Sequence, residues 1–315
     1  SLHDALPIYK LKDIKRAYME GKIDKKTYIK NIHEIHKMLF DYCDFIKNTN
    51  IKTIHIDDEK VTMITKKDNI KLLGDRDDQR SIPIEILNFG EYEEEQINMI
   101  KKFINDDSVI FDIGANIGYH SISLSKFNNK CKIYSFEPII KTYKYLENNI
   151  KNNELKNIKT FNIAFSNNDG EQTFYYYPEG SVNASAAILN DDIEVEKILC
   201  KIEKIDTFVK NHDIKIDLIK CDTEGSELLV FKGANETLEK FKPIIFTEML
   251  RKWSKKFEYH PNDIIKYLGK FGYECFTIRG NNLEKFTMMD EQTIDTNFVF
   301  LNSIKHMEFI NKLAK

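Results

Sequence analysis

One stretch of the chain, residues 109–121, joins an apolar run to an acid and a pair of glycines. It reads VIFDIGANIGYHS, with the acid at Asp112 and the glycines at Gly114 and Gly118. A continuous apolar run that ends in a glycine turn is typical of a buried parallel strand, and the residues after Gly118 have the pattern of a helix. Glycine at 114 lets the chain turn and approach a ligand closely. The stretch therefore predicts a strand–turn–helix unit of a doubly wound α/β sheet.

The details of this turn restrict the ligand that it can bind. Its glycines are spaced G-x-x-x-G, whereas a dinucleotide-binding turn has G-x-G-x-x-G and places backbone amides against a pyrophosphate. An acid two residues before the first glycine would repel a pyrophosphate, but it suits a ligand with a cationic centre and an amino group. S-adenosylmethionine has both and carries no phosphate, so we expect it rather than a nicotinamide cofactor. The expected contacts within the turn are Asp112, Gly114, Ala115, Asn116 and Gly118.

Two more strand ends extend this predicted cofactor site. The next apolar run ends at Glu137 and Pro138, about 20 residues after the first glycine, where a Rossmann-type sheet places an acid on the ribose hydroxyls. The strand predicted over 158–165 contains Ile163 and Ala164, which we expect beside the adenine. An apolar strand end also fits an ordinary core position, so these two residues have a second interpretation.

A group of acids follows the strand predicted over 216–221. Asp222 and Glu224 lie directly after it, and Glu227 comes three residues later. Open α/β sheets bind their ligands at the carboxyl ends of their strands. The residues that follow predict a helix over 224–240. Capping of this helix by Asp222 would explain one of these acids, but not the whole group.

Together these segments resemble the FkbM family of S-adenosylmethionine-dependent methyltransferases. The resemblance rests on four segments, 112–118, 136–138, 220–227 and 231–234, and Phe231 stands where the family has leucine. It covers about 91–301 and leaves out the N-terminal helices. The resemblance implies a class I, Rossmann-like fold with a mostly parallel seven-stranded sheet and an antiparallel last strand. It also implies O-methylation of a hydroxyl on a sugar or a natural product.

A sugar hydroxyl is a poor nucleophile, so a base or a metal should help to remove its proton. We expect Asp222 to be that base and also to contact the cofactor, with Glu224 orienting it. His120 and Glu248 are the alternatives. Several carboxylates could hold a divalent cation, but no D-x-D or His–acid cluster marks a metal site, and we predict none.

The acceptor is expected to contact a loop and the region after a late strand. Asn183 and Ser185 belong to a small, polar loop that suits either a substrate lid or a simple surface turn. Glu248 ends a strand, and Trp253 follows it among basic residues that either face an anionic carrier or form a solvated loop. We predict a sugar, sugar nucleotide or lipid-linked sugar as acceptor, as in surface-polysaccharide biosynthesis.

The residues before the predicted methyltransferase domain (91–315) form two further segments. Residues 51–90 alternate β-like runs, including 82–87, with polar turns and predict a β lead-in. Residues 1–50 are predicted to be helical, with a break at Gly21. A seam with coiled-coil spacing runs along the second helix: Tyr28, Ile32, Ile35, Leu39, Tyr42 and Ile46. It favours either a homodimer or a helix packed on its own catalytic domain.

Composition excludes several classes of protein. The net charge of −3 argues against a nucleic-acid-binding protein, and no apolar run approaches the roughly 20 residues of a membrane helix. The five scattered cysteines and the lack of a signal-peptide pattern at the N-terminus predict a cytoplasmic protein. A nicotinamide-dependent oxidoreductase and a non-catalytic oligomeric scaffold remain the alternatives to a methyltransferase.

Overall fold

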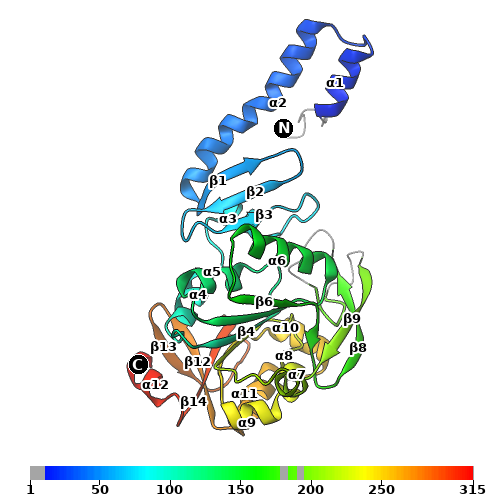
Figure 1. Cartoon of the computed structure of the whole chain (residues 1–315). Coiled ribbons are helices and arrows are strands. Elements are labelled where there is room, and N and C mark those ends of the chain that lie inside the picture. Colours follow the sequence, from blue (N-terminus) through cyan, green and yellow to red (C-terminus); the bar gives the residue numbers. More distant parts are fainter. Residues whose placement is uncertain (1–10, 178–183, 190–194, 315) are drawn as a thin grey trace.

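A computed structural model describes residues 11–177, 184–189 and 195–314, and its centre is an eight-stranded sheet (Figure 1). The strands are β4 (Val109–Ile113), β5 (Lys132–Phe136), β6 (Ile158–Phe161), β10 (Leu218–Cys221), β11 (Ile244–Glu248), β12 (Tyr273–Arg279), β13 (Asn282–Phe286) and β14 (Asn297–Asn302). Their order across the sheet is β13-β12-β14-β11-β10-β4-β5-β6. The five strands from β11 to β6 are parallel, whereas β14 lies antiparallel between β11 and β12.

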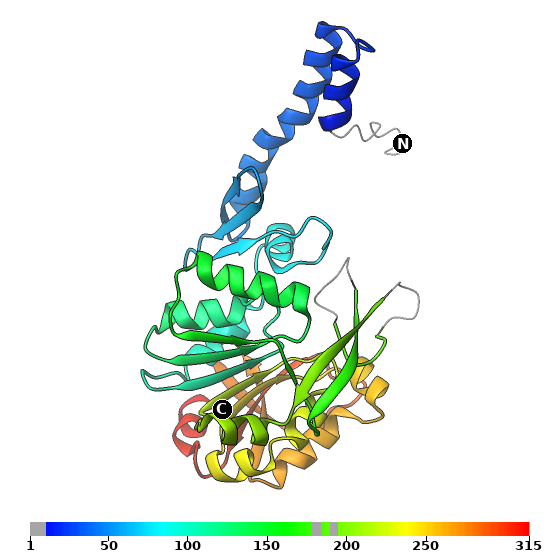
Figure 2. The same cartoon turned by 45° about the vertical axis from the view of Figure 1, so that its right-hand side comes forward.

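Helices cover both faces of this sheet (Figure 2). One face carries α4 (Glu94–Lys101), α5 (Tyr119–Phe127), α6 (Ile140–Asn152) and α12 (Met307–Leu313). The other carries α7 (Ile205–His212), α8 (Glu227–Lys232), α9 (Asn235–Phe241) and α11 (Pro261–Gly269). Because successive strand residues point to opposite faces, Ile110 packs into the first apolar core and Phe111 into the second. Both are fully buried.

A second, smaller sheet lies beside the parallel edge and consists of β7 (Ala164–Phe165), β8 (Gly170–Tyr176) and β9 (Glu196–Glu203). The hairpin of β8 and β9 is antiparallel, and β7 pairs with β9 in parallel. After β11 the chain forms the short helices α10 (Arg251–Ser254) and η3 (Lys255–Phe257). These segments flank the carboxyl ends of the central strands.

The N-terminal part begins with a helical hairpin of α1 (Leu11–Met19) and α2 (Lys25–Phe45), which projects from the body (Figures 1 and 2). Asp24 caps α2, since its carboxylate accepts a hydrogen bond from the Thr27 amide at 2.7 Å. Then follow η1 (Ile46–Asn48), an antiparallel sheet of β1 (Ile51–Ile56), β2 (Val61–Thr65) and β3 (Lys71–Leu73), and α3 (Ile82–Phe89). The three-stranded sheet contributes Ile51, Met63 and Leu72 to the first apolar core.

The predicted fold class is confirmed, including the antiparallel last strand, β14. The prediction of seven strands was wrong, because Asn282–Phe286 pairs with β12 as an eighth, edge strand. Only Leu283 of that strand is buried, so its sequence lacks the apolar alternation of a typical strand. Across the described residues, the structure shows no helix that combines the length and apolarity needed to cross a membrane.

Three local predictions also need correction. The run 82–87 forms α3 rather than a strand, because Pro83 begins a helical turn and the buried Ile82 and Ile86 are spaced for a helix. The helix predicted over 224–240 is two helices, divided at Gly233. A Cβ there would lie 2.1 Å from the Ser166 carbonyl oxygen, so the chain needs glycine at this contact. The strand predicted over 158–165 is also divided, into β6 and β7, which belong to different sheets.

Candidate functional site

A cavity of about 360 Å³ lies at the carboxyl ends of β4, β5, β10 and β11. Most of the predicted site residues line it: Gly114, Ala115, Asn116, His120, Glu137, Pro138, Ile163, Ala164, Asp222, Glu224, Glu248 and Trp253. A larger and more open hollow of about 1030 Å³ lies at the opposite ends of the strands, and its lining includes none of the predicted site residues. The smaller cavity is therefore the candidate site.

The glycine turn after β4 passes very close to the end of β10. Gly114 has φ +73°, and a Cβ at this position would lie 1.8 Å from the Asp222 carbonyl oxygen, so no side chain fits. The amides of Gly114 and Ala115 both donate to the Phe136 carbonyl, at 3.1 and 2.9 Å. Gly118, in contrast, makes room for packing, because a Cβ there would meet Leu146 at 2.6 Å.

Glu137 is 6% exposed and ties the glycine turn to the end of β5. Its Oε2 accepts the Asn116 amide at 3.0 Å and its Oε1 accepts the Ile139 amide at 2.9 Å. Burial raises the pKa of Glu137 to about 7, although these two amides act in the opposite direction. The carboxylate thus holds the turn in place while it still lines the cavity.

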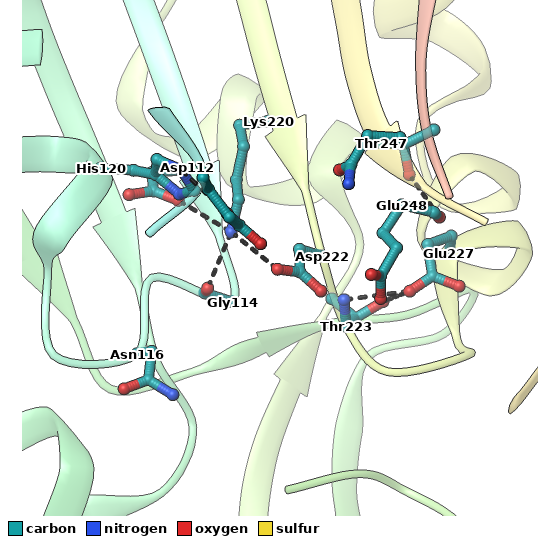
Figure 3. Close-up of polar contacts among 12 residues, drawn as sticks. Asp112, Gly114, Asn116, His120, Lys220, Asp222, Thr223, Glu227, Thr247 and Glu248 are labelled. Carbon is teal, nitrogen blue, oxygen red and sulfur yellow. Dashed lines mark hydrogen bonds and ion pairs between the residues drawn. The ribbon is translucent and has the colours of Figure 1, made fainter. Parts of the chain in front are cut away.

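Under the turn, Lys220 lies between two carboxylates (Figure 3). Its Nζ is 3.6 Å from Oδ1 of Asp112 and 3.3 Å from Oδ2 of Asp222, and it donates to the Gly114 carbonyl at 3.1 Å. Burial acts to lower the pKa of Lys220, but the charges of Asp222 and Asp112 outweigh it and the net shift is upward. Because the side chain is only 5% exposed, these two carboxylates stabilise its positive charge in place of water.

Asp112 itself does not reach the cavity. It is fully buried and accepts a hydrogen bond from the Ser121 hydroxyl at 2.6 Å. Direct contact between Asp112 and a cofactor was predicted, but the structure places this carboxylate beneath the turn, where it supports Lys220. Its place on β4, directly opposite Lys220 on β10, explains this position.

Three carboxylates at the ends of β10 and β11 converge on the cavity. Oxygen atoms of Asp222, Glu224 and Glu248 all lie within 4.8 Å of one another. Burial, with the charges of Asp222 and Glu224 next in size, raises the pKa of Glu248 to about 10. Burial and Asp222 likewise raise the pKa of Glu224. These three side chains could hold a cation, or they could share protons among themselves.

The nearby Glu227 belongs to the local framework instead. Its Oε1 accepts the amides of Thr223 and Gly225 at 3.0 and 3.1 Å, and its Oε2 accepts the Tyr259 hydroxyl at 3.2 Å. Glu224 has φ +54°, in the left-handed region, so Glu227 fixes a turn that an ordinary helix start would not form. That turn directs Glu224 toward Asp222.

Sequence reasoning missed Tyr92 and Glu93, which line the cavity from the start of α4. Oε2 of Glu93 lies 3.0 Å from Nε2 of His120, and His120 is 6% exposed. Burial alone would raise the pKa of Glu93, but the contact with His120 reverses the shift and lowers it. Burial and the surrounding acids, Glu93 first among them, raise the pKa of Tyr92. The acid-rich run before α4 gave no signal that distinguished these two residues.

The predicted acceptor residues have different positions. Trp253 is half-buried in the wall of the cavity, close to Gly225, where a Cβ would lie 2.9 Å from the Trp253 backbone. Lys252 lies over the indole ring, with Nζ 4.1 Å from its centroid. Ser185 is buried and donates to the Glu224 carbonyl at 2.9 Å, so it braces the acidic turn rather than lining the cavity. Asn183 lies outside the described residues.

Comparison with known protein families identifies the family of this chain. Residues 112–275, about half of the chain, match the family model of the methyltransferase FkbM domain. The chain belongs to this family. The segment that matches runs from β4 into β12 and contains the glycine turn, Lys220 and the three converging carboxylates.

Relatives of this FkbM-family chain are distant. It is 28% identical over 156 residues to the methyltransferase sdnD of Sordaria araneosa, which covers 40% of this chain and 60% of that protein. It is 24% identical over 154 residues to the hexuronic acid methyltransferase AglP of Haloferax volcanii, covering 49% and 61%. The crystal structure of methyltransferase FkbM from Methylobacillus flagellatus aligns with a TM-score of 0.44 and 18% identity, over 69% of this chain and 53% of that one. The chain thus spans about 60% of the length of these two curated relatives.

Proposed function

We propose that this protein is an S-adenosylmethionine-dependent O-methyltransferase that methylates a hydroxyl group of a sugar or glycan precursor. The observation that carries the proposal is the convergence of the glycine turn, Glu137 and the three carboxylates on one cavity. Membership in the FkbM family and the name of the relative AglP, a hexuronic acid methyltransferase, support the choice of reaction and of acceptor. We propose a free, nucleotide-linked or lipid-linked sugar as the partner and no nucleic acid.

The residues at the strand ends fit the cofactor. Gly114 lets the turn pack directly against the Asp222 backbone, where no side chain would fit, and the Glu137 carboxylate can accept hydrogen bonds from ribose hydroxyls. Ile163 and Ala164 give the cavity an apolar wall that suits the adenine. Carboxylates beside the cavity complement a positive charge, whereas a pyrophosphate would be repelled. When bound, S-adenosylmethionine supplies an electrophilic methyl group on a sulfonium.

The chain's own contribution is to position the acceptor and to take its proton. Asp222 is the proposed base, because it faces the cavity and Lys220 balances its charge at 3.3 Å. Glu224 and Glu248 lie close enough to orient the hydroxyl. His120, with Glu93 at 3.0 Å, is the alternative base on the opposite wall.

A divalent cation is a further occupant that Asp222, Glu224 and Glu248 could accept, since carboxylate oxygens are the ligands that Mg²⁺ and Ca²⁺ prefer. We do not favour it, because Lys220 already provides a positive charge beside Asp222. Methyl transfer is therefore expected to survive treatment with a chelator. Loss of activity on chelation, with recovery on addition of Mg²⁺, would show that the reaction needs the metal.

The experiment that tests the proposed function is a methyl-transfer screen with the purified chain. S-adenosylmethionine is combined with a panel of free sugars, sugar nucleotides and lipid-linked sugars, and each mixture is analysed for S-adenosylhomocysteine and for a methylated acceptor. We expect at least one sugar to gain an O-methyl group. Asp222→Asn should abolish this transfer and leave S-adenosylhomocysteine binding measurable. Full activity of that variant would exclude Asp222 as the base.

A further inference from the structure

The helical hairpin at the N-terminus has an apolar face that is not covered within the described part of the chain. Helix α2 is 21 residues long and none of its residues is buried. Its seam is half-covered at both ends: next to α1, Tyr18 stacks on Tyr28 with ring centroids 4.6 Å apart and Ile14 of α1 is buried, and at the other end Ile46 packs against the first apolar core. Between these contacts, Met38, Leu39, Tyr42 and Phe45 are 56, 53, 41 and 50% exposed. An apolar helix face of this kind normally packs against a partner.

The charge pattern of α2 indicates what that partner is. Helix positions on either side of the seam usually carry the charges that select or reject a partner helix. Here those positions are Ile29, Asn31, His36, Met38, Cys43 and Phe45, and none is an acid, a lysine or an arginine. The charged residues of the exposed half, Glu34, Lys37, Asp41 and Asp44, lie on the opposite side of the helix. An identical helix can therefore approach the seam without repulsion between like charges.

The same pattern disfavours a membrane surface. A helix that lies on an anionic bilayer has lysine and arginine on its polar face. The polar face opposite the exposed seam has three acids and one lysine, and that lysine is already paired with Glu34 at 2.9 Å. The hairpin also projects from the body, which leaves the seam accessible to a second molecule (Figures 1 and 2).

We infer that two copies of this chain associate through the seam of α2, with Leu39 and Tyr42 at the centre of the contact. The seam has the spacing of 4 and 3 residues with which helices of two chains interlock. Association of this kind would bury the side chains that a single copy leaves in water. It makes the hairpin an interaction surface that is separate from the cavity at the strand ends.

Two variants test this inference with the full chain. Leu39→Glu places a charge in the seam, whereas Phe40→Glu makes the same kind of change at a residue that is 70% exposed and lies outside the seam. Light scattering is expected to give twice the mass of 37.1 kDa for the unmodified chain and for Phe40→Glu, and the single-chain mass for Leu39→Glu. Circular dichroism is measured on all three proteins to confirm that α2 stays folded.

Cys43 provides a second readout, because it is exposed and the other four cysteines are buried. A pyrene label on Cys43 is expected to give excimer emission in the unmodified chain and in Phe40→Glu, but not in Leu39→Glu. A single-chain mass for the unmodified protein would overturn the inference. So would an equal effect of the two substitutions, or binding of the monomer to phosphatidylserine vesicles in place of dimer formation.

Discussion

The buried ammonium group of Lys220 lies 3.3 Å from the carboxylate of Asp222. A buried charge of the central sheet is therefore paired with a carboxylate that faces the cavity. Nζ of Lys220 also donates to the Gly114 carbonyl at 3.1 Å and faces Asp112 at 3.6 Å. One lysine therefore joins the glycine turn of β4 to the acidic turn of β10.

Lys220→Met is expected to lower the free energy of unfolding by about 3–5 kcal/mol, because it leaves the Asp112 carboxylate buried without a cation. Urea unfolding followed by circular dichroism measures the loss. The double variant Lys220→Met, Asp112→Asn should recover much of it, since the asparagine carries no charge. Arg16→Met, at an ion pair whose side chains are 66 and 45% exposed, is the control and should change little. A loss for Lys220→Met no larger than for Arg16→Met would contradict this role.

Gly114→Ala is expected to weaken S-adenosylhomocysteine binding at least about tenfold, because its methyl group would displace either the turn or the Asp222 backbone. Isothermal titration calorimetry measures the affinity. Gly280→Ala is a matched control: Gly280 also has a positive φ, of +58°, but a Cβ there would have no atom within 4 Å. Equal affinities for the two variants would show that the close contact at Gly114 does not shape the cofactor site.

Affinity for S-adenosylhomocysteine should increase as the pH rises through about 7, the pKa to which burial raises Glu137. Below this pH the carboxyl is increasingly protonated and loses capacity to accept hydrogen bonds from the ribose. Titrations at several pH values give the profile. Glu137→Gln should bind more weakly, with a flatter profile over the same range. An unchanged profile in that variant would assign the pH dependence to another group.

Glu248→Gln is expected to stabilise the cofactor-free protein at alkaline pH while reducing methyl transfer. The pKa of Glu248 is raised to about 10 by burial and by neighbouring acids, Asp222 first. A raised carboxyl pKa favours folding while the group is protonated, and this contribution is lost as the pH rises from the ordinary value of 4.5 toward 10. The melting temperature of Glu248→Gln should therefore exceed that of the unmodified chain by a margin that grows over this range. A constant margin would contradict the assignment.

Much of the fold could be predicted because the central strands are marked by apolar runs and by glycine turns. The strand at 109–113 and the turn at Gly114 lie where the sequence placed them. The edge strand β13 was missed because one edge of such a strand is free and Leu283 is its single buried residue. The sequence of helix α3 predicts a strand because four of its first six residues are apolar, although Pro83 is compatible with the first turn of a helix.

The candidate site was predictable only where its residues follow a strand of the core. Asp222, Glu224 and Glu248 do so, and the structure brings them within 4.8 Å of one another. Glu93 is different, because it reaches His120 from a helix that precedes the first central strand. Nothing in the local sequence distinguishes it from the acids beside it. The inward position of Asp112 could not be predicted from the sequence either, because it depends on the pairing of β4 with β10.

The most direct test of the account is a calorimetric titration of the unmodified chain with S-adenosylhomocysteine and, separately, with NAD. The carboxylates around the cavity and the G-x-x-x-G turn predict binding of S-adenosylhomocysteine at one site per chain, weakened by Gly114→Ala and by Glu137→Gln. They predict no binding of NAD, whose pyrophosphate would meet these acids. Tight binding of NAD without binding of S-adenosylhomocysteine would contradict the central claim.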